Sequence, residues 1–290
     1  MQITVKNLSY RYGEKDKNLN VLALNDVSLE IAEGEFFGII GKTGSGKSTF
    51  VQHINGLIKL QKNSGQITVG DFDLSAKKCD FTALRSKIGM VFQYPEYQLF
   101  AETVKDDVAF GLKNFHPDVK EDELDALVKE ALTTCGLNYE EIKDKSPFDL
   151  SGGQKRRVAI AGVIVSKPEI LVLDEPAAGL DPKGKEEFLQ LLTAFHKTFA
   201  KTIIIVSHDM DLVAEYCDRA AVFKDGRITA VGTPKEIFSD YENVKDCGLQ
   251  LPVTAAAVKA LKEKGVNVDC DFKVDSFVAE VTRLHEGGLL

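Results

Sequence analysis

The chain has 290 residues, and its 36 Lys and Arg against 44 Asp and Glu give a formal net charge of -8. This length allows a hydrophobic core without disulfides or metals, and the acidic balance provides no overall attraction to nucleic acid or anionic lipid. The longest apolar run that we find, residues 158–165, is far short of the roughly 20 residues of a membrane span. The first residues lack the apolar stretch of a secretory signal. The five scattered cysteines contain no C-x-x-C pair, which argues against a disulfide scaffold or a zinc module.

The first seventy residues show the patterns of β-strands. Residues 27–31 alternate between apolar and polar side chains, and residues 36–40 form a continuous apolar run. These patterns predict a half-buried and a fully buried strand. A glycine-rich loop follows and is predicted to lead into a helix over residues 48–57. The pair Gly70-Asp71, between two short strand-like stretches, predicts a hairpin.

The middle of the chain predicts an α/β fold with an insertion. Apolar runs at residues 170–173 and 203–206 flank a helical stretch, as in a buried parallel sheet. Residues from about 95 to 167 have a mostly helical pattern that interrupts this alternation, so we interpret them as an inserted subdomain. Asp225-Gly226 lies between two further strand-like runs and predicts a second hairpin.

The composition changes past about residue 246, which divides the chain into a main domain, 1–245, and an extension, 246–290. The extension shows a helical pattern over residues 252–264 with Gly265 as a stop signal. Residues 266–274 alternate like a strand, and a last helix is expected from about residue 275.

A phosphate-binding motif follows the buried strand at residues 36–40. Residues 41–48 fit G-x-x-x-x-G-K-[ST], placed after a strand and before a helix as the mechanism requires. The alternative is a glycine-rich turn that binds nothing, but spacing and context together predict a nucleoside triphosphate. Lys47 supplies a charge to the β- and γ-phosphates, Ser48 a magnesium ligand, and Thr49 a contact near the α-phosphate. The remaining loop residues that would cradle the phosphates are Gly41, Lys42, Thr43, Gly44, Ser45 and Gly46.

A pair of carboxylates ends the buried strand at residues 170–173. Asp174 can hold magnesium at the strand end. Glu175 can accept a proton from the attacking water or orient that water. Alone, this pair would indicate only two acidic residues at the surface, at the end of a strand. In a chain with a phosphate loop, it predicts a catalytic role.

A second glycine-rich motif, Leu-Ser-Gly-Gly-Gln, occupies residues 150–154. Ser151 can cap the apolar helix that follows, while Gly152 and Gly153 expose backbone donors at its N-terminus. By itself this motif would indicate only a helix cap after a loop.

In combination these motifs resemble the ABC ATPases, and the resemblance covers roughly residues 1 to 240. Residues 150–154 look like the ABC signature motif, in the right order between the phosphate loop and the carboxylate pair. The resemblance implies that Tyr12 stacks on adenine, that Gln93 is the Q-loop glutamine, that Asp181 belongs to the D-loop and that His208 is the switch histidine. It implies a P-loop NTPase fold of ABC-ATPase type, with a parallel core sheet, an antiparallel β subdomain, an inserted α-helical subdomain and here a small C-terminal α+β extension.

The family resemblance also implies how ATP and Mg²⁺ are held. Two ATPase domains close head to tail, so Ser151, Gly152, Gly153 and Gln154 would serve the partner's nucleotide while Lys47 and Glu175 serve this chain's own. Catalysis would rest on Glu175, His208 and Gln93. The magnesium ligands implied are Ser48, Gln93 and Asp174.

The run after Gln93, Tyr-Pro-Glu-Tyr-Gln-Leu-Phe, resembles the ATPases of energy-coupling factor (ECF) importers, and residues 176–181 look closer to the second of their two types. This implies a peripheral subunit at the cytoplasmic face of the cell membrane, paired with a different ATPase. Its other partners would be a transmembrane coupling protein and a membrane subunit that binds vitamins or other micronutrients. Residues 93–111 would form part of the groove for the coupling helices. The extension would pack against the partner ATPase or act as a stabilising cap.

Two alternatives remain open. An ATPase of another ABC importer, for amino acids or metal ions, would share all of this chemistry and differ only in its partners. A soluble ABC protein of translation or DNA repair usually carries two cassettes, a long coiled coil or a zinc insertion, and we find none of these in the sequence.

Overall fold

The computed structural model describes residues 1–13 and 20–288. Its centre is a six-stranded sheet in the order β10-β9-β3-β8-β7-β6. Neighbouring strands from β6 to β9 run parallel, and β10 pairs with β9 antiparallel. The strands are β3 (Phe36–Gly41), β6 (Ile88–Val91), β7 (Ile170–Asp174), β8 (Thr202–Ser207), β9 (Arg219–Lys224) and β10 (Arg227–Gly232). The apolar runs that predicted buried strands therefore lie side by side in this sheet.

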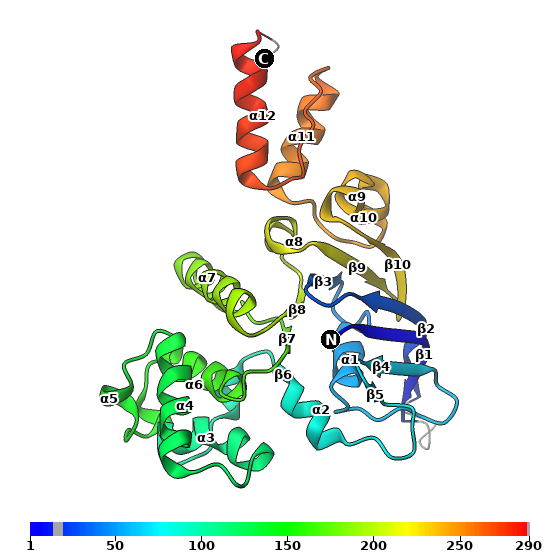
Figure 1. Cartoon of the computed structure of the whole chain (residues 1–290). Coiled ribbons are helices and arrows are strands. Elements are labelled where there is room, and N and C mark those ends of the chain that lie inside the picture. The colour runs from blue at the N-terminus through cyan, green and yellow to red at the C-terminus, as the bar shows by residue number, and fades with distance from the viewer. Residues whose placement is uncertain (14–19, 289–290) are drawn as a thin grey trace.

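A four-stranded antiparallel sheet in the order β2-β1-β4-β5 lies beside the central sheet (Figure 1). Its strands are β1 (Ile3–Tyr12), β2 (Val21–Ile31), β4 (Gln66–Val69) and β5 (Phe72–Asp73). Helices α1 (Lys47–Ile54) and α2 (Phe81–Lys87) lie next to this sheet. The hairpin predicted at Gly70-Asp71 joins β4 to β5, and the one predicted at Asp225-Gly226 joins β9 to β10, so both predictions are confirmed.

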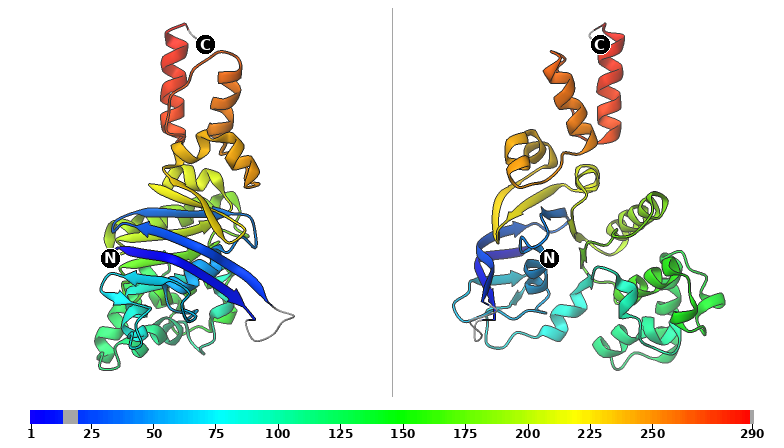
Figure 2. Two further views of the ribbon diagram at one scale, coloured as in Figure 1. Left: turned by 90° about the vertical axis from the view of Figure 1, so that its right-hand side faces the viewer. Right: turned by 180° about the vertical axis from the view of Figure 1, so that it is seen from behind.

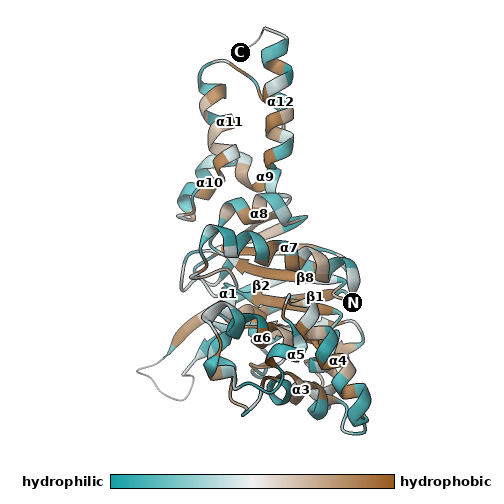
Figure 3. Cartoon of the chain, turned by 90° about the vertical axis from the view of Figure 1, so that its left-hand side faces the viewer, coloured by the Kyte–Doolittle hydropathy of each residue, from teal (hydrophilic) through white to brown (hydrophobic). Residues whose placement is uncertain are grey.

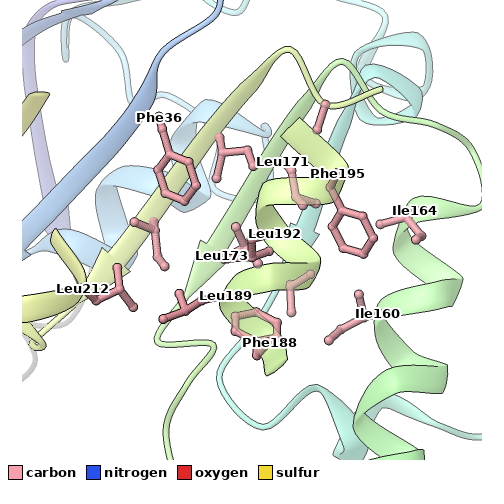
Figure 4. Packing of buried hydrophobic residues seen from close by; sticks show 14 of the residues in the cluster. Phe36, Ile160, Ile164, Leu171, Leu173, Phe188, Leu189, Leu192, Phe195 and Leu212 are labelled. Atoms are coloured by element: carbon pink, nitrogen blue, oxygen red, sulfur yellow. The ribbon is translucent and has the colours of Figure 1, made fainter. Parts of the chain in front are cut away.

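Alternate side chains of the central strands point to two hydrophobic cores. On β3, Phe37 and Ile39 belong to the core shared with the antiparallel sheet and α1, whereas Phe36 and Ile40 belong to the core on the other face. Helix α7 (Pro182–Thr198) covers that second face. Figure 4 shows the α7 side chains lying between those of β7 and α6 (Gly152–Ile164); the labelled residues include Phe188, Leu192 and Phe195 of α7, Leu171 and Leu173 of β7, and Ile160 and Ile164 of α6.

The segment between β6 and β7 forms a separate group of helices. These are η1 (Pro95–Gln98), α3 (Val104–Phe115), α4 (Glu121–Thr134), α5 (Tyr139–Ile142), η2 (Pro147–Asp149) and α6. Their apolar stripes are buried in the same core as α7, with Val108, Leu132 and Val158 fully buried. Their outer faces are hydrophilic, whereas the central strands are the most apolar elements (Figure 3). The segment over residues 95–167 is helical, as expected. Its status as a separate subdomain with these boundaries stays a prediction.

The C-terminal part stands at the opposite end of the molecule from these helices (Figure 2). After β8 come α8 (Met210–Tyr216), the β9–β10 hairpin, α9 (Pro234–Ser239), α10 (Tyr241–Asp246), α11 (Val253–Glu263) and α12 (Val274–Glu286). The two helices expected beyond residue 246 are present. The strand expected at residues 266–274 is wrong: between residues 246 and 288 the structure contains helices and no strand, so the extension is α rather than α+β.

The remainder of the predicted fold class is confirmed by the two sheets and the helices around them. Among residues 1–13 and 20–288, no helix is both long and apolar enough to cross a membrane.

Candidate functional site

A cleft of about 420 Å³ opens where β3 ends and α1 begins. It is lined by the phosphate loop, by the ends of β1 and β2, and by residues that follow β6, β7 and β8. The lining thus gathers residues that are distant in the sequence but were all predicted to act on one nucleotide. Those predicted residues are Tyr12, Thr43, Gly44, Gly46, Lys47, Ser48, Thr49, Gln93, Glu175 and His208.

Glycine is required at two positions of the loop because other backbone approaches closely. Gly41 has φ +153°, and a Cβ there would lie 2.3 Å from the carbonyl oxygen of Phe223. Gly46 has φ +103°, and its Cβ would lie 2.5 Å from the carbonyl oxygen of Ala23. Both glycines therefore let the loop turn tightly from the strand into α1, whose N-terminus is a favourable site for an anion.

The Lys47 side chain is buried and lies along the loop. Its Nζ donates to the carbonyl oxygens of Gly41 at 2.7 Å and Lys42 at 2.9 Å. Burial lowers the pKa of Lys47, and the nearby carboxylates Glu175 and Asp174 oppose that shift. The ammonium group is therefore held at the floor of the cleft with acidic groups close by.

Asp174, at the end of β7, is buried and faces Ser48. Burial raises the pKa of Asp174, while a hydrogen bond from Ser48 and the charge of Lys47 lower it. Within the described residues its Oδ1 is buried and has no hydrogen-bond partner. A buried carboxylate oxygen without a partner is costly, and this one lies beside a hydroxyl that can also ligate a hard cation.

Glu175 and His208 are brought together although they are far apart in the sequence. His208 Nδ1 and Glu175 Oε2 are 2.6 Å apart. Glu175 has φ +51°, an uncommon conformation for a residue with a Cβ, and its N–H donates to the Val206 carbonyl at 3.0 Å. The loop after β7 is thus tied to the end of β8, which places the Glu175 carboxylate at the cleft and next to the histidine.

Tyr12 and Gln93 complete the lining. The Tyr12 hydroxyl lies 3.1 Å from Thr49 Oγ1 of α1, and its ring packs edge-on against Tyr10. Gln93 follows β6 and is exposed at the cleft. The aromatic ring and the amide therefore line the same cleft as the phosphate loop.

The Ser151–Gln154 motif lies outside this cleft. Ser151 Oγ accepts from the Gln154 N–H at 3.3 Å, and Gln154 Oε1 accepts from the Ser151 N–H at 3.1 Å, which forms a capping box at the start of α6. A Cβ on Gly152 or Gly153 would meet nothing within 4 Å. The motif therefore presents an open helix N-terminus, and its residues are absent from the lining of the cleft at the phosphate loop.

Asp181 also lies away from the cleft. It caps the N-terminus of α7. Its Oδ1 accepts from the Gly184 N–H at 2.8 Å. Asp181 and Gly153 line a second cavity of about 830 Å³ between α6 and α7. Asp181 therefore shares a cavity with the start of α6 and is absent from the lining of the cleft at the phosphate loop.

Sequence reasoning missed Arg156, which is 6% exposed within α6. Its guanidinium donates to the carbonyl oxygens of Pro176 and, at 3.0 Å, Ala178. Burial lowers the pKa of Arg156, and the nearby Glu96 and Tyr94 oppose that shift. Helix α6 is thus bound to the segment directly after Glu175. The signal in the sequence was an arginine among the apolar residues of this helix, which indicates that the charge has a partner but does not identify it.

A contact of Lys42 was also not foreseen. The end of the Lys42 side chain lies directly against Gly248, so closely that a Cβ at this glycine would overlap Lys42 Cε and Nζ. The side chain of this loop residue therefore lies across the turn that follows α10.

Exposed aromatic side chains gather in residues 93–111, the segment expected to meet coupling helices. Tyr97 is 83% exposed, and Phe100 packs edge-on against Phe110 with their ring centroids 4.8 Å apart. Large apolar groups exposed in this number on one segment are typical of an interaction surface.

Comparisons with known proteins agree with this geometry. The ABC transporter family profile matches residues 24–178. The energy-coupling factor transporter ATP-binding protein EcfA2 of Clostridium tetani is 47% identical over 268 residues, which cover 92% of this chain and 91% of that protein. Among solved structures, CbiO1 of Clostridium perfringens, described as part of the ABC transporter complex CbiONQ, has a TM-score of 0.71 at 41% identity. That alignment covers 89% of this chain and 98% of CbiO1.

A second solved structure is the ATP-binding cassette MJ0796, as a dimer in a post-hydrolysis state bound to ADP and Pi. It has a TM-score of 0.69 at 30% identity, and covers 79% of this chain and 97% of its own. The profile match spans more than half of the chain, and the relatives match over nearly their whole length. The chain therefore belongs to the ABC transporter ATPases, among the energy-coupling factor transporter ATP-binding proteins.

Proposed function

We propose that this chain hydrolyses ATP to power uptake of vitamins or other micronutrients by an ECF importer, as its second type of ATPase subunit. The observation that carries the proposal is the single cleft that unites the phosphate loop with Gln93, Glu175 and His208, while the signature motif stays exposed elsewhere. A site divided in this way needs a second ATPase to complete it.

Within the cleft, each side chain has a separate task. Lys47 and the N–H groups at the start of α1 bind and orient the phosphates. The Glu175 carboxylate accepts the proton of the attacking water, and His208, 2.6 Å away, orients that carboxylate and contacts the γ-phosphate. Tyr12, which is 40% exposed at the rim, stacks on the adenine.

The residues beside Lys47 fit a magnesium ion. Ser48, Gln93 and Asp174 offer three oxygen atoms of the kind that Mg²⁺ prefers, and the buried Asp174 Oδ1 has no other hydrogen-bond partner among the described residues. Bound there, Mg²⁺ would neutralise charge on the β- and γ-phosphates.

The second half of each ATP site comes from a partner. The open N-terminus of α6, with Ser151, Gly152, Gly153 and Gln154, would face the γ-phosphate held by the other ATPase, and Asp181 would lie at the same interface. The dimeric state of MJ0796 supports the presence of a second ATPase. We propose that the partner is a different ECF ATPase, so that the two form a heterodimer.

The membrane partners would bind at the aromatic surface of residues 93–111. Tyr97, Phe100 and Phe110 offer apolar contacts to the helices of a transmembrane coupling subunit, which in turn carries the membrane subunit that binds substrate. The chain would then be held at the cytoplasmic face of the cell membrane through these proteins. We propose no nucleic-acid partner.

The test is purification of the tagged chain from native membranes in mild detergent, with partners identified by mass spectrometry. Recovery of a second ATPase, a coupling membrane protein and small substrate-binding subunits supports the proposal. Recovery of a conventional permease pair would support a role in an ABC importer but refute the ECF assignment. Recovery of ribosomes or DNA-repair factors would refute a role in transport.

A second experiment tests the divided site. In the complex, Gly153→Asp places a negative charge at the open start of α6, where a Cβ meets nothing within 4 Å, so the fold is expected to survive. ATP binding by this chain should persist while hydrolysis at the partner's loop is lost. Loss of ATP binding at this chain's own Lys47 instead would contradict the assignment of the motif to the partner's nucleotide.

A further inference from the structure

The two C-terminal helices begin without caps of their own. Pro252 and Lys273, the residues at the N-cap positions of α11 and α12, provide no side-chain hydrogen bond. Instead, the first N–H of α11, from Val253, donates to Asp211 Oδ1 at 2.7 Å. The first N–H of α12, from Val274, donates to Glu215 Oε2 at 3.0 Å. Both helix starts are therefore capped by acidic side chains from another element.

Asp211 and Glu215 both belong to α8 and stand four residues apart, on one face of that helix. The other face of α8 is anchored in the protein core, where Leu212 and Val213 are buried. A single short helix thus holds the starts of both α11 and α12.

Helix α8 directly follows the histidine of the nucleotide cleft. Its N-cap is Asp209, whose Oδ1 accepts from the Leu212 N–H at 3.0 Å and whose other oxygen pairs with Lys185 of α7. The preceding residue is His208, which bonds to Glu175. His208 of the cleft is therefore connected to the C-terminal helices through the backbone of α8 and through the hydrogen bonds of Asp211 and Glu215.

The connection between α11 and α12 also links the starts of the two helices to each other. Phe272 is 4% exposed and has φ +68°, a rare conformation for a bulky residue. Its carbonyl accepts from Thr254 Oγ1 at 2.5 Å, which ties the start of α12 to the start of α11. A cavity of about 320 Å³ lies between α7, α8 and these helix starts.

We propose that Asp211 and Glu215 are positioning residues that couple the His208 segment to α11 and α12, so that ATP in the cleft changes how firmly the first turns of both helices are held. This inference rests on the proposed binding of ATP beside His208. Neither acid lines the cleft, so both would act through α8.

Hydrogen exchange measured by mass spectrometry on the full chain, with and without MgATP, tests the coupling. In the unmodified protein, ATP should slow exchange of residues 41–49 and also change exchange in peptides over residues 253–258 and 274–279. Asp211→Ala should raise exchange of residues 253–258 about fivefold, the equivalent of one lost cap, and abolish their response to ATP. Glu215→Ala should do the same to residues 274–279.

Matched variants separate the hydrogen bond from general loss of charge. Glu242→Ala removes an exposed carboxylate from the first turn of α10 and should leave both peptides unchanged. Asp211→Asn keeps an acceptor oxygen and should restore both the protection and the ATP response. Exchange of the buried strand β8 reports whether each variant is folded.

The outcomes distinguish the two proposals. If residues 41–49 are protected by ATP but residues 253–258 and 274–279 do not respond, the coupling is refuted while ATP binding stands. A response that survives in both alanine variants also refutes it. If residues 41–49 show no protection, the proposed function itself fails.

Discussion

The buried Arg156 provides a sharp quantitative prediction, because its neighbour on α6 is a natural control. Arg156→Met removes the guanidinium that donates to the Pro176 and Ala178 carbonyls. Two hydrogen bonds from a charged donor contribute about 3–6 kcal/mol together. Methionine recovers part of this, because burying the arginine charge is itself unfavourable. We therefore expect a loss of about 2–4 kcal/mol in the free energy of unfolding.

Arg157→Met is the control. Arg157 pairs with Glu187 at 2.5 Å, but the two side chains are 38% and 43% exposed. An exposed ion pair of this kind contributes about 0–1 kcal/mol. Both variants make the same substitution at adjacent positions of one helix, so differences in helix propensity cancel.

Urea denaturation of the two variants, followed by circular dichroism, measures the difference. The larger loss should belong to Arg156→Met, and its kcat for ATP in the assembled complex should also fall, because Pro176–Ala178 follow Glu175 directly. Arg156→Lys, which keeps the charge but replaces the two donor nitrogens Nη1 and Nη2 with one, should be intermediate. Equal losses for the Arg156 and Arg157 variants would refute the role assigned to the buried contact.

Two further predictions concern the cleft, and a third concerns His53, a buried residue of α1. Glu175→Gln should lower kcat by about 10²–10⁴ while ATP binding persists and the closed dimer accumulates; near-normal turnover in the complex would remove Glu175 as the base. Lys47→Ala should weaken ATP binding about ten- to a hundredfold by calorimetry, and an unchanged Kd would exclude its contact with the phosphates. His53 is buried, its Nδ1 lies 2.7 Å from the Thr49 carbonyl, and burial lowers its pKa. Because the unfolded chain then binds the proton more readily, stability should fall as the pH drops from the ordinary value of about 6.5 toward the lowered pKa. A thermal-melting series should show this slope in the unmodified protein and a smaller one in His53→Gln; identical slopes would contradict it.

The sequence was most informative where one residue type serves one backbone or chemical need. The strand, glycine loop and helix around Lys47 were predictable because apolar continuity, turn geometry and phosphate chemistry all indicate the same structure. The same holds for Asp174-Glu175 at the end of a buried strand. The roles of these residues stay predictions, but the structure brings Lys47, Glu175 and His208 to one cleft.

The error at residues 266–274 has a physical cause. Val268, Cys270 and Phe272 alternate with polar residues and are all buried, so the period-two pattern described burial correctly. A strand also needs a neighbour to accept its backbone hydrogen bonds, and the elements around this segment are helices. The left-handed Phe272 then turns the chain into α12.

Contacts that depend on tertiary structure were beyond the reach of the sequence. Arg156 reaches carbonyls some twenty residues away, and Asp211 reaches the N–H of Val253, 42 positions along the chain. Carboxylates and guanidinium groups are common on helices, and no local pattern reveals which backbone group they meet.

The division of the interior into two cores has a consequence for how the protein loses structure. The core on the α7 side contains Leu132 from the helical insertion, Leu171 from the sheet and Phe272 from the C-terminal helices. These segments therefore share one continuous interior, and neither the insertion nor the extension has a separate one. We expect them to melt as a unit with that face of the sheet, and limited proteolysis to release neither as a stable fragment.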